Sequence, residues 1–242
     1  MNSNELNKIL KAKIDELRGT ISINQYREIA DIFQKLVEAS IKDIWKKHNN
    51  KVQLSLNGVP ICLEGSAVNT STAFGFMIEE FLVRQLPNFF TRSINSTINS
   101  VEDFSYIDDS KIELMVNLKV EKNTSNNNGI VAGNILRNRY IANNKPKLYL
   151  VLKSKYHLDE QHSDLHFDGT ISYYLESFIT RPNCLRADSR NWSSEYNILS
   201  GRLQAPNRTE LSQCGINSIP EPELIREFIN NLADNLRTAR NS

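Results

Sequence analysis

Residues Ile112 to Glu121 read I-E-L-M-V-N-L-K-V-E. Aliphatic residues alternate with mostly polar ones, and successive side chains of a β-strand point to opposite faces. This alternation predicts a strand with one aliphatic face and one polar face. Asn117, Lys119 and Glu121 are two residues apart, so they share the polar face.

The residues just before this strand predict its antiparallel partner. The segment V-E-D-F-S-Y-I at 101–107 is followed by D-D-S-K at 108–111, which is typical of a tight polar turn. The turn folds Asp103 back towards Asn117 and Lys119. A carboxylate, an amide oxygen and an ammonium are therefore expected in one small patch.

The register of this hairpin decides which carboxylate reaches the patch, because a one-residue slip moves every side chain to the other face. A four-residue turn sets Asp103 opposite Val116, whereas a five-residue turn or a bulge sets it opposite Asn117. Asp108 or Asp109 is an alternative metal ligand. We rank Asp103 first, because the strand that follows it brings it back beside the lysine.

Such a patch suits a divalent cation. Mg²⁺ prefers oxygen ligands and is bound by one or two carboxylates together with waters and phosphate oxygens. A lysine beside the metal orients or deprotonates an attacking water and helps to neutralise a pentavalent phosphate. The alternative interpretation is a half-buried strand whose polar face is only solvated.

Amphipathic patterns predict that the chain begins with helices. Apolar residues recur at helical spacing over residues 3–18 and 23–48. Residues 51–63 then favour a hairpin or two short strands around the Asn57-Gly58 pair.

A further helix is expected within T-S-T-A-F-G-F-M-I-E-E-F-L-V-R-Q-L-P at 70–87, which opens with capping residues and closes at Pro87. At 100° per residue, Glu79 falls near the edge of the buried stripe, where an acid can face a cleft. Glu80 lies further round, towards solvent. The alternative is that both glutamates are solvated.

The segment after the central strand predicts a crossover. N-T-S-N-N-N-G at 123–129 breaks the pattern, and a helix is expected from near Ile130 to about Asn144. The segment K-L-Y-L-V-L-K-S-K-Y-H-L at 147–158 then reads as a second strand. A strand, a helix and a strand make a βαβ unit, so we predict an α/β (α+β) fold with a central mixed β-sheet flanked by helices.

This order of elements resembles the PD-(D/E)xK nuclease superfamily, and within it the type II restriction endonucleases. The resemblance covers residues 73–155 and lies in a helix with Glu79, a strand with Asp103 and the pair Asn117-Leu118-Lys119. Two positions depart from the pattern. Glu102 stands where the motif has proline, and Asn117 replaces the acid that precedes the lysine, a variant that some restriction enzymes also show.

The resemblance implies a restriction-endonuclease-like core and Mg²⁺-dependent hydrolysis of DNA at a specific sequence. Asp103 and the Asn117 oxygen would hold the metal, and Lys119 would position the nucleophilic water. Glu121, on the same face, or Glu79 would supply the charge that Asn117 lacks.

The resemblance also implies a partner and an organisation. The family usually acts as a symmetric homodimer on palindromic double-stranded DNA. We expect one endonuclease domain over residues 1–242. It has an N-terminal helical part at 1–50, a catalytic core at 73–155, and a DNA-recognition and C-terminal helical part at 156–242 that ends in an amphipathic helix opened by Pro222.

The distribution of charge favours DNA binding more than the net charge of +1 does. Residues 119–155 carry eight Lys and Arg, including Arg137 and Arg139, against one acid, and a concentrated positive field suits a phosphate backbone.

Residues 181–208 are rich in side chains that read base edges. The alternatives are a solvated lysine face and an ordinary surface loop. Our candidates for base contact are Arg186, Arg190, Asn191, Arg202 and Gln204.

Other features favour a reduced, cytoplasmic protein. The sequence has no run of about 18 apolar residues and no signal-peptide pattern at its start. Three scattered cysteines are expected to be free thiols. His157, His162 and His166 fall in one acidic stretch, but their spacing matches no zinc pattern, so we expect a loop rim or a DNA contact there.

Overall fold

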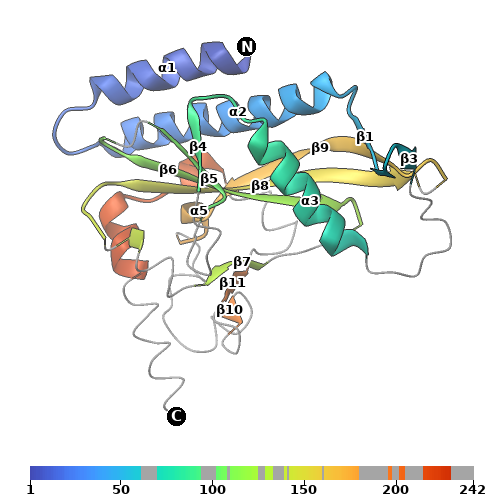
Figure 1. The fold of residues 1–242 in the computed structure, drawn as a ribbon. Helices are drawn as coiled ribbons and strands as arrows, with labels where there is room; N and C mark the ends of the chain where they lie inside the picture. The colour runs from blue at the N-terminus through green and yellow to red at the C-terminus, as the bar shows by residue number, and fades with distance from the viewer. Residues whose placement is uncertain are drawn as a thin grey trace.

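A mixed six-stranded β-sheet forms the centre of the structure, and helices lie against it (Figure 1). The predicted α/β (α+β) class, a central mixed sheet flanked by helices, is confirmed. Within the described residues, none of the helices combines the length and the apolar character that crossing a bilayer demands. The computed structural model describes residues 1–60, 70–93, 102–107, 110–124, 129–132, 139–140, 142–159, 161–179, 196–197, 202–204 and 215–229.

The strand order explains the mixed character of the sheet. β6 and β8 are parallel, and the other neighbours are antiparallel. The predicted hairpin and the predicted parallel strand are therefore both present. From one edge to the other the strands are β1 (Lys51–Gln53), β9 (Asp164–Tyr174), β8 (Lys147–Asp159), β6 (Glu113–Lys122), β5 (Phe104–Tyr106) and β4 (Phe90–Arg92).

The predicted helix from near Ile130 is wrong at its start. β7 (Gly129–Ala132) is a strand that pairs with β11 (Arg202–Gln204), which in turn pairs with β10 (Tyr196–Asn197). The two β-branched residues of β7 favour a strand, and its pairing with β11 satisfies backbone groups that a helix would have satisfied locally. Helical conformation is present further on, at residues 139–140.

Both predicted N-terminal helices are confirmed. The two helices are α1 (Ser3–Glu16) and α2 (Ile23–Lys47). They are capped by Asn2 and Ser22, whose side chains each accept a hydrogen bond from the backbone N–H three residues on. The short hairpin of β2 (Ser55–Leu56) and β3 (Val59–Pro60) follows β1, as expected.

α2 covers the aliphatic face of the sheet. Trp45 Nε1 donates to Ser154 Oγ at 3.1 Å, and the Tyr174 hydroxyl donates to the Ala30 carbonyl at 2.7 Å. Ser154 lies in register with Val120, so the aliphatic face of β6 also turns towards α2. The polar face of β6 is therefore on the opposite side, away from the two N-terminal helices.

One carboxyl group is fully buried beneath this sheet. Glu176 opens α5 (Glu176–Ile179), and its Oε1 accepts hydrogen bonds from the Tyr140 hydroxyl and, at 2.9 Å, from the Tyr149 N–H. Burial raises the pKa of Glu176 to about 7, although both hydrogen bonds favour the charged form.

This raised pKa predicts a loss of stability with pH. The folded protein binds the Glu176 proton more tightly than the unfolded chain, so stability falls as pH rises from about 4.5 through about 7. Glu176→Gln keeps the shape of the neutral acid. Between pH 4.5 and pH 8 we expect its free energy of unfolding to fall by about 1–3 kcal/mol less than that of the wild type. Urea unfolding at the two pH values measures the difference, and equal losses in both proteins would contradict it.

Candidate functional site

The open edge of β6 organises the candidate site. β5 pairs with β6 at Val116 and Met115, and further along no strand among the described residues pairs with β6 on that side. Leu118 N–H instead donates to Asp103 Oδ2 at 2.7 Å, and Val120 N–H donates to Glu79 Oε1 at 2.9 Å. Two carboxylates therefore take the place of a strand partner.

The hairpin register brings Asp103 to the predicted patch. Phe104 lies opposite Val116, and continuation of this pairing sets Asp103 opposite Asn117. Asn117 Nδ2 donates to Asp103 Oδ2 at 3.2 Å, so the two side chains are in contact. The alternative ligands, Asp108 and Asp109, lie outside the described residues.

Glu79 reaches the same edge from α3 (Thr70–Arg84). A Cβ atom added at Gly75 would lie 2.8 Å from the Val120 carbonyl oxygen, so glycine lets this helix cross β6 closely. One helical turn later, Glu79 meets the Val120 N–H. Glu80 instead pairs with Arg84 and Arg92 near the surface, as expected of the glutamate further round the helix.

Burial raises the pKa of both carboxyl groups. The pKa of Glu79 is about 7 and that of Asp103 about 6, and in each case a backbone hydrogen bond opposes the shift. The positive charge of Lys119 also lowers both pKa values, while the charge of Asp103 raises that of Glu79. Two acids that titrate near neutral pH beside a lysine are typical of a functional site.

A buried amide oxygen at this edge is available to a cation. Asn117 Oδ1 is buried and has no hydrogen-bond partner among the described residues, while Nδ2 of the same amide is held by Asp103. A buried oxygen without a donor costs about 1–3 kcal/mol, and a cation would satisfy it. One carboxylate, one amide oxygen and waters form a ligand set that fits Mg²⁺.

Glu121 is placed differently from the other predicted ligands. Its buried carboxylate lies 2.5 Å from Lys155 Nζ and 3.3 Å from Lys153 Nζ. Burial lowers the pKa of Lys153, and the pairing with Glu121 opposes this. Sequence reasoning missed these two lysines because their role depends on the parallel register, which sets Lys119 beside Lys153 and Glu121 beside Lys155.

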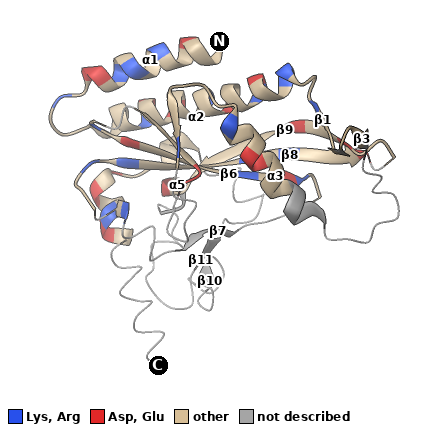
Figure 2. Cartoon of the chain, viewed as in Figure 1, with Lys and Arg blue, Asp and Glu red and all other residues tan. Residues whose placement is uncertain are grey.

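Several of the basic residues in the positively charged segment 119–155 pair with acidic residues. Arg139 lies 3.4 Å from both Glu102 and Glu113, and Lys147 lies 3.9 Å from Glu113. Figure 2 shows Lys and Arg positions on the strands of the sheet, with Asp and Glu positions among them. Together with Lys153 and Lys155 they are matched by acids, so they do not add up to an open positive surface.

The remaining predicted DNA contacts lie largely beyond what the structure describes. Only the backbone is described for two of them, Arg202 and Gln204, which belong to β11. Those outside the described residues are Arg137, Arg186, Arg190 and Asn191.

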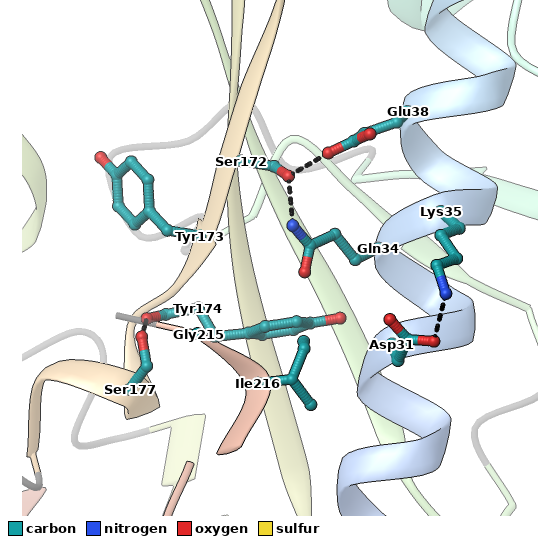
Figure 3. A pocket seen from close by; sticks show the side chains of 10 residues that line it. All are labelled: Asp31, Gln34, Lys35, Glu38, Ser172, Tyr173, Tyr174, Ser177, Gly215 and Ile216. Atoms are coloured by element: carbon teal, nitrogen blue, oxygen red, sulfur yellow. Dashed lines mark hydrogen bonds and ion pairs between the residues drawn. The ribbon is translucent and has the colours of Figure 1, made fainter. Parts of the chain in front are cut away.

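A separate cavity of about 290 Å³ lies on the α2 side of the sheet (Figure 3). Its polar groups bond to one another: Ser172 donates to Glu38 at 2.5 Å and accepts from Gln34 at 2.7 Å, and Lys35 pairs with Asp31. None of the residues predicted from the sequence lines it, so it is not the predicted site.

Metal binding at the β6 edge is expected to strengthen with pH. Asp103 binds a cation only when ionised, so Mg²⁺ affinity should fall about tenfold for each pH unit below the pKa of about 6. Calorimetric titration between pH 5 and pH 8 measures this. Asp103→Asn should remove the binding. Glu80→Gln changes a glutamate near the surface of α3 and should leave the binding unchanged. Equal affinity at both pH values would argue against a role for Asp103.

Comparison with known proteins gives no assignment. No protein-family model matches the chain, and no curated protein matches its sequence. The function is therefore inferred from the arrangement of Glu79, Asp103, Asn117 and Lys119 at the edge of β6.

Proposed function

We propose that this protein is a type II restriction endonuclease, which hydrolyses phosphodiester bonds of double-stranded DNA at a specific sequence with Mg²⁺. The observation that carries the proposal is the meeting of Glu79, Asp103 and Asn117, within the field of Lys119, at the open edge of β6. The order of the elements supports it, because α3 precedes the β5–β6 hairpin and a parallel strand follows, as in the PD-(D/E)xK arrangement that the sequence resembles.

Each side chain has a role in this proposal. The Asp103 carboxylate and Asn117 Oδ1 would hold the cation. Bound Mg²⁺ supplies a Lewis acid for the scissile phosphate and lowers the pKa of a bound water. Lys119 orients the attacking water and stabilises the charge that develops on the phosphate. Glu79, with a pKa of about 7, is able to accept a proton at neutral pH.

The proposal extends to partners and location. We infer that the protein acts as a homodimer, because a two-fold dimer presents two equivalent sites to a palindromic duplex. It would act in the cytoplasm as the nuclease of a restriction–modification system. Recognition would depend on the segments around β11, where Arg202 and Gln204 lie.

Incubation with unmethylated phage DNA and Mg²⁺ tests the activity. We expect discrete fragments on a gel, and we expect Lys119→Ala and Asp103→Ala each to lower the cleavage rate by about 100-fold or more, as loss of a group that stabilises transition-state charge does. Lys122→Ala is the matched control, because Lys122 lies on the same strand but on the other face. A pure, folded protein that binds DNA and never cuts it with Mg²⁺ or Mn²⁺ would overturn the proposal.

A second candidate function is a non-catalytic DNA-binding protein with a decayed nuclease site. The observation in its favour is Asn117, an amide where the motif has an acid. Asn117→Asp separates the two functions. An active enzyme already cuts DNA before the substitution, whereas a decayed site gains cleavage only when the carboxylate is restored, while its specific DNA binding is insensitive to metal.

A further inference from the structure

The far end of the β8–β9 hairpin brings together a second group of candidate metal ligands. Asp159 ends β8 and lies opposite Asp164, the first residue of β9, while His166 follows two residues later. One ligand atom from each of the three side chains lies within 4.8 Å of the others. Asp159 is six residues beyond Lys153 along β8, which is roughly 20 Å at the rise of a strand. The group is thus separate from the site at the edge of β6.

Asp164 has an unused ligand atom inside the protein. Its side chain is only 3% exposed, and its Oδ2 pairs with the Lys51 ammonium from β1. Its Oδ1 is buried and has no hydrogen-bond partner in the part of the chain that the structure describes. A buried carboxylate oxygen without a donor is costly, so its place within this cluster points to a cation.

His166 is distinguished from the other histidines by its ring nitrogens. His48, His157 and His162 each contact an oxygen of Gln85, Asp168 or Asp159 through a ring nitrogen, at 2.9, 2.7 and 2.7 Å. His166 stacks on the His157 ring, with centroids 5.0 Å apart, and its ring nitrogens make no hydrogen bond or ion pair with any described residue. Its imidazole is therefore available as a nitrogen ligand.

Asp159 is already oriented for binding. Its Oδ1 accepts hydrogen bonds from the backbone N–H groups of Gln161 and His162, at 3.1 and 3.3 Å. Its Oδ2 contacts His162 Nδ1 at 2.7 Å. Such outer hydrogen bonds fix the direction of ligating carboxylates in metal sites.

We propose that Asp159, Asp164 and His166 form a binding site for a first-row transition-metal dication, represented by Zn²⁺. An imidazole and two carboxylates suit Zn²⁺, and three protein ligands leave a position for water. Mg²⁺ is a poorer match, because it prefers oxygen ligands alone. A bound ion would link the end of β8 to the start of β9. It would lie close to β1, because Lys51 of β1 pairs with Asp164.

Zinc titration of the untagged, full-length protein tests the site. The Asp103→Asn background removes the acid proposed to bind Mg²⁺, so the result does not depend on the proposed nuclease activity. We expect one Zn²⁺ to bind with micromolar or tighter affinity by calorimetry, and Co²⁺ in its place to show a visible d–d spectrum. His166→Ala should weaken binding by more than the roughly 10- to 100-fold that loss of an outer hydrogen-bond partner costs.

Two matched variants sharpen the test. His157→Ala removes the stacked neighbour and should change the Zn²⁺ affinity by less than His166→Ala does. Lys51→Met removes the ammonium that competes for Asp164, so it should tighten binding and enlarge the rise in melting temperature that Zn²⁺ gives. The His166 side chain is partly exposed and makes no hydrogen bond or ion pair with described residues, so the folded state of His166→Ala should match the wild type by circular dichroism. Absence of Zn²⁺ binding by the wild type, or full binding by His166→Ala, would overturn the proposal.

Discussion

The constraint on which the site depends is the edge of β6 beyond Val116, which pairs with no strand in the part of the chain that the structure describes. A strand edge inside a protein must satisfy its N–H groups, and β5 ends before it can do so for Leu118 and Val120. Asp103 and Glu79 provide the acceptors, and each is partly buried because it lies against the sheet. The position that lets these acids complete the backbone hydrogen bonding also buries them, and burial raises their pKa although the hydrogen bonds lower it. It also gathers negative charge beside Lys119.

The neighbouring strand β8 balances charge in the rest of this face. Glu121 and Glu113 of β6 meet Lys155, Lys153 and Lys147 of β8 inside the protein. A buried charge without a partner is strongly destabilising, so a shift of one residue between the two strands would be costly. The acid–lysine pairs thus favour one register, and that register sets Lys119 beside Lys153.

Much of the fold follows from local patterns in the sequence. The alternation around Asn117 and Lys119 predicts β6 and its polar face, and the helical angle of Glu79 predicts that it, unlike Glu80, turns towards the sheet. The β7 segment was misassigned, because its preference is decided by pairing with β11, some seventy residues later in the chain.

The site was predicted less completely than the fold. Pairs between parallel strands cannot be derived from composition, so the lysines that neutralise Glu121 were missed and the positively charged segment 119–155 was assigned to a surface. The sequence singled out the histidines of the β8–β9 hairpin but not the grouping of Asp159, Asp164 and His166, because these side chains meet through strand pairing and not through a recognisable spacing.

Gly75 sets the distance between α3 and the sheet. A side chain at this position would collide with the Val120 carbonyl, and a rigid helix would move outward as a unit. Glu79 is one turn away on the same helix, so the displacement would separate its carboxylate from β6 and from Asp103. The absence of a side chain at Gly75 thus sets how closely α3 approaches β6, and with it the separation of Glu79 and Asp103, which lie on different elements.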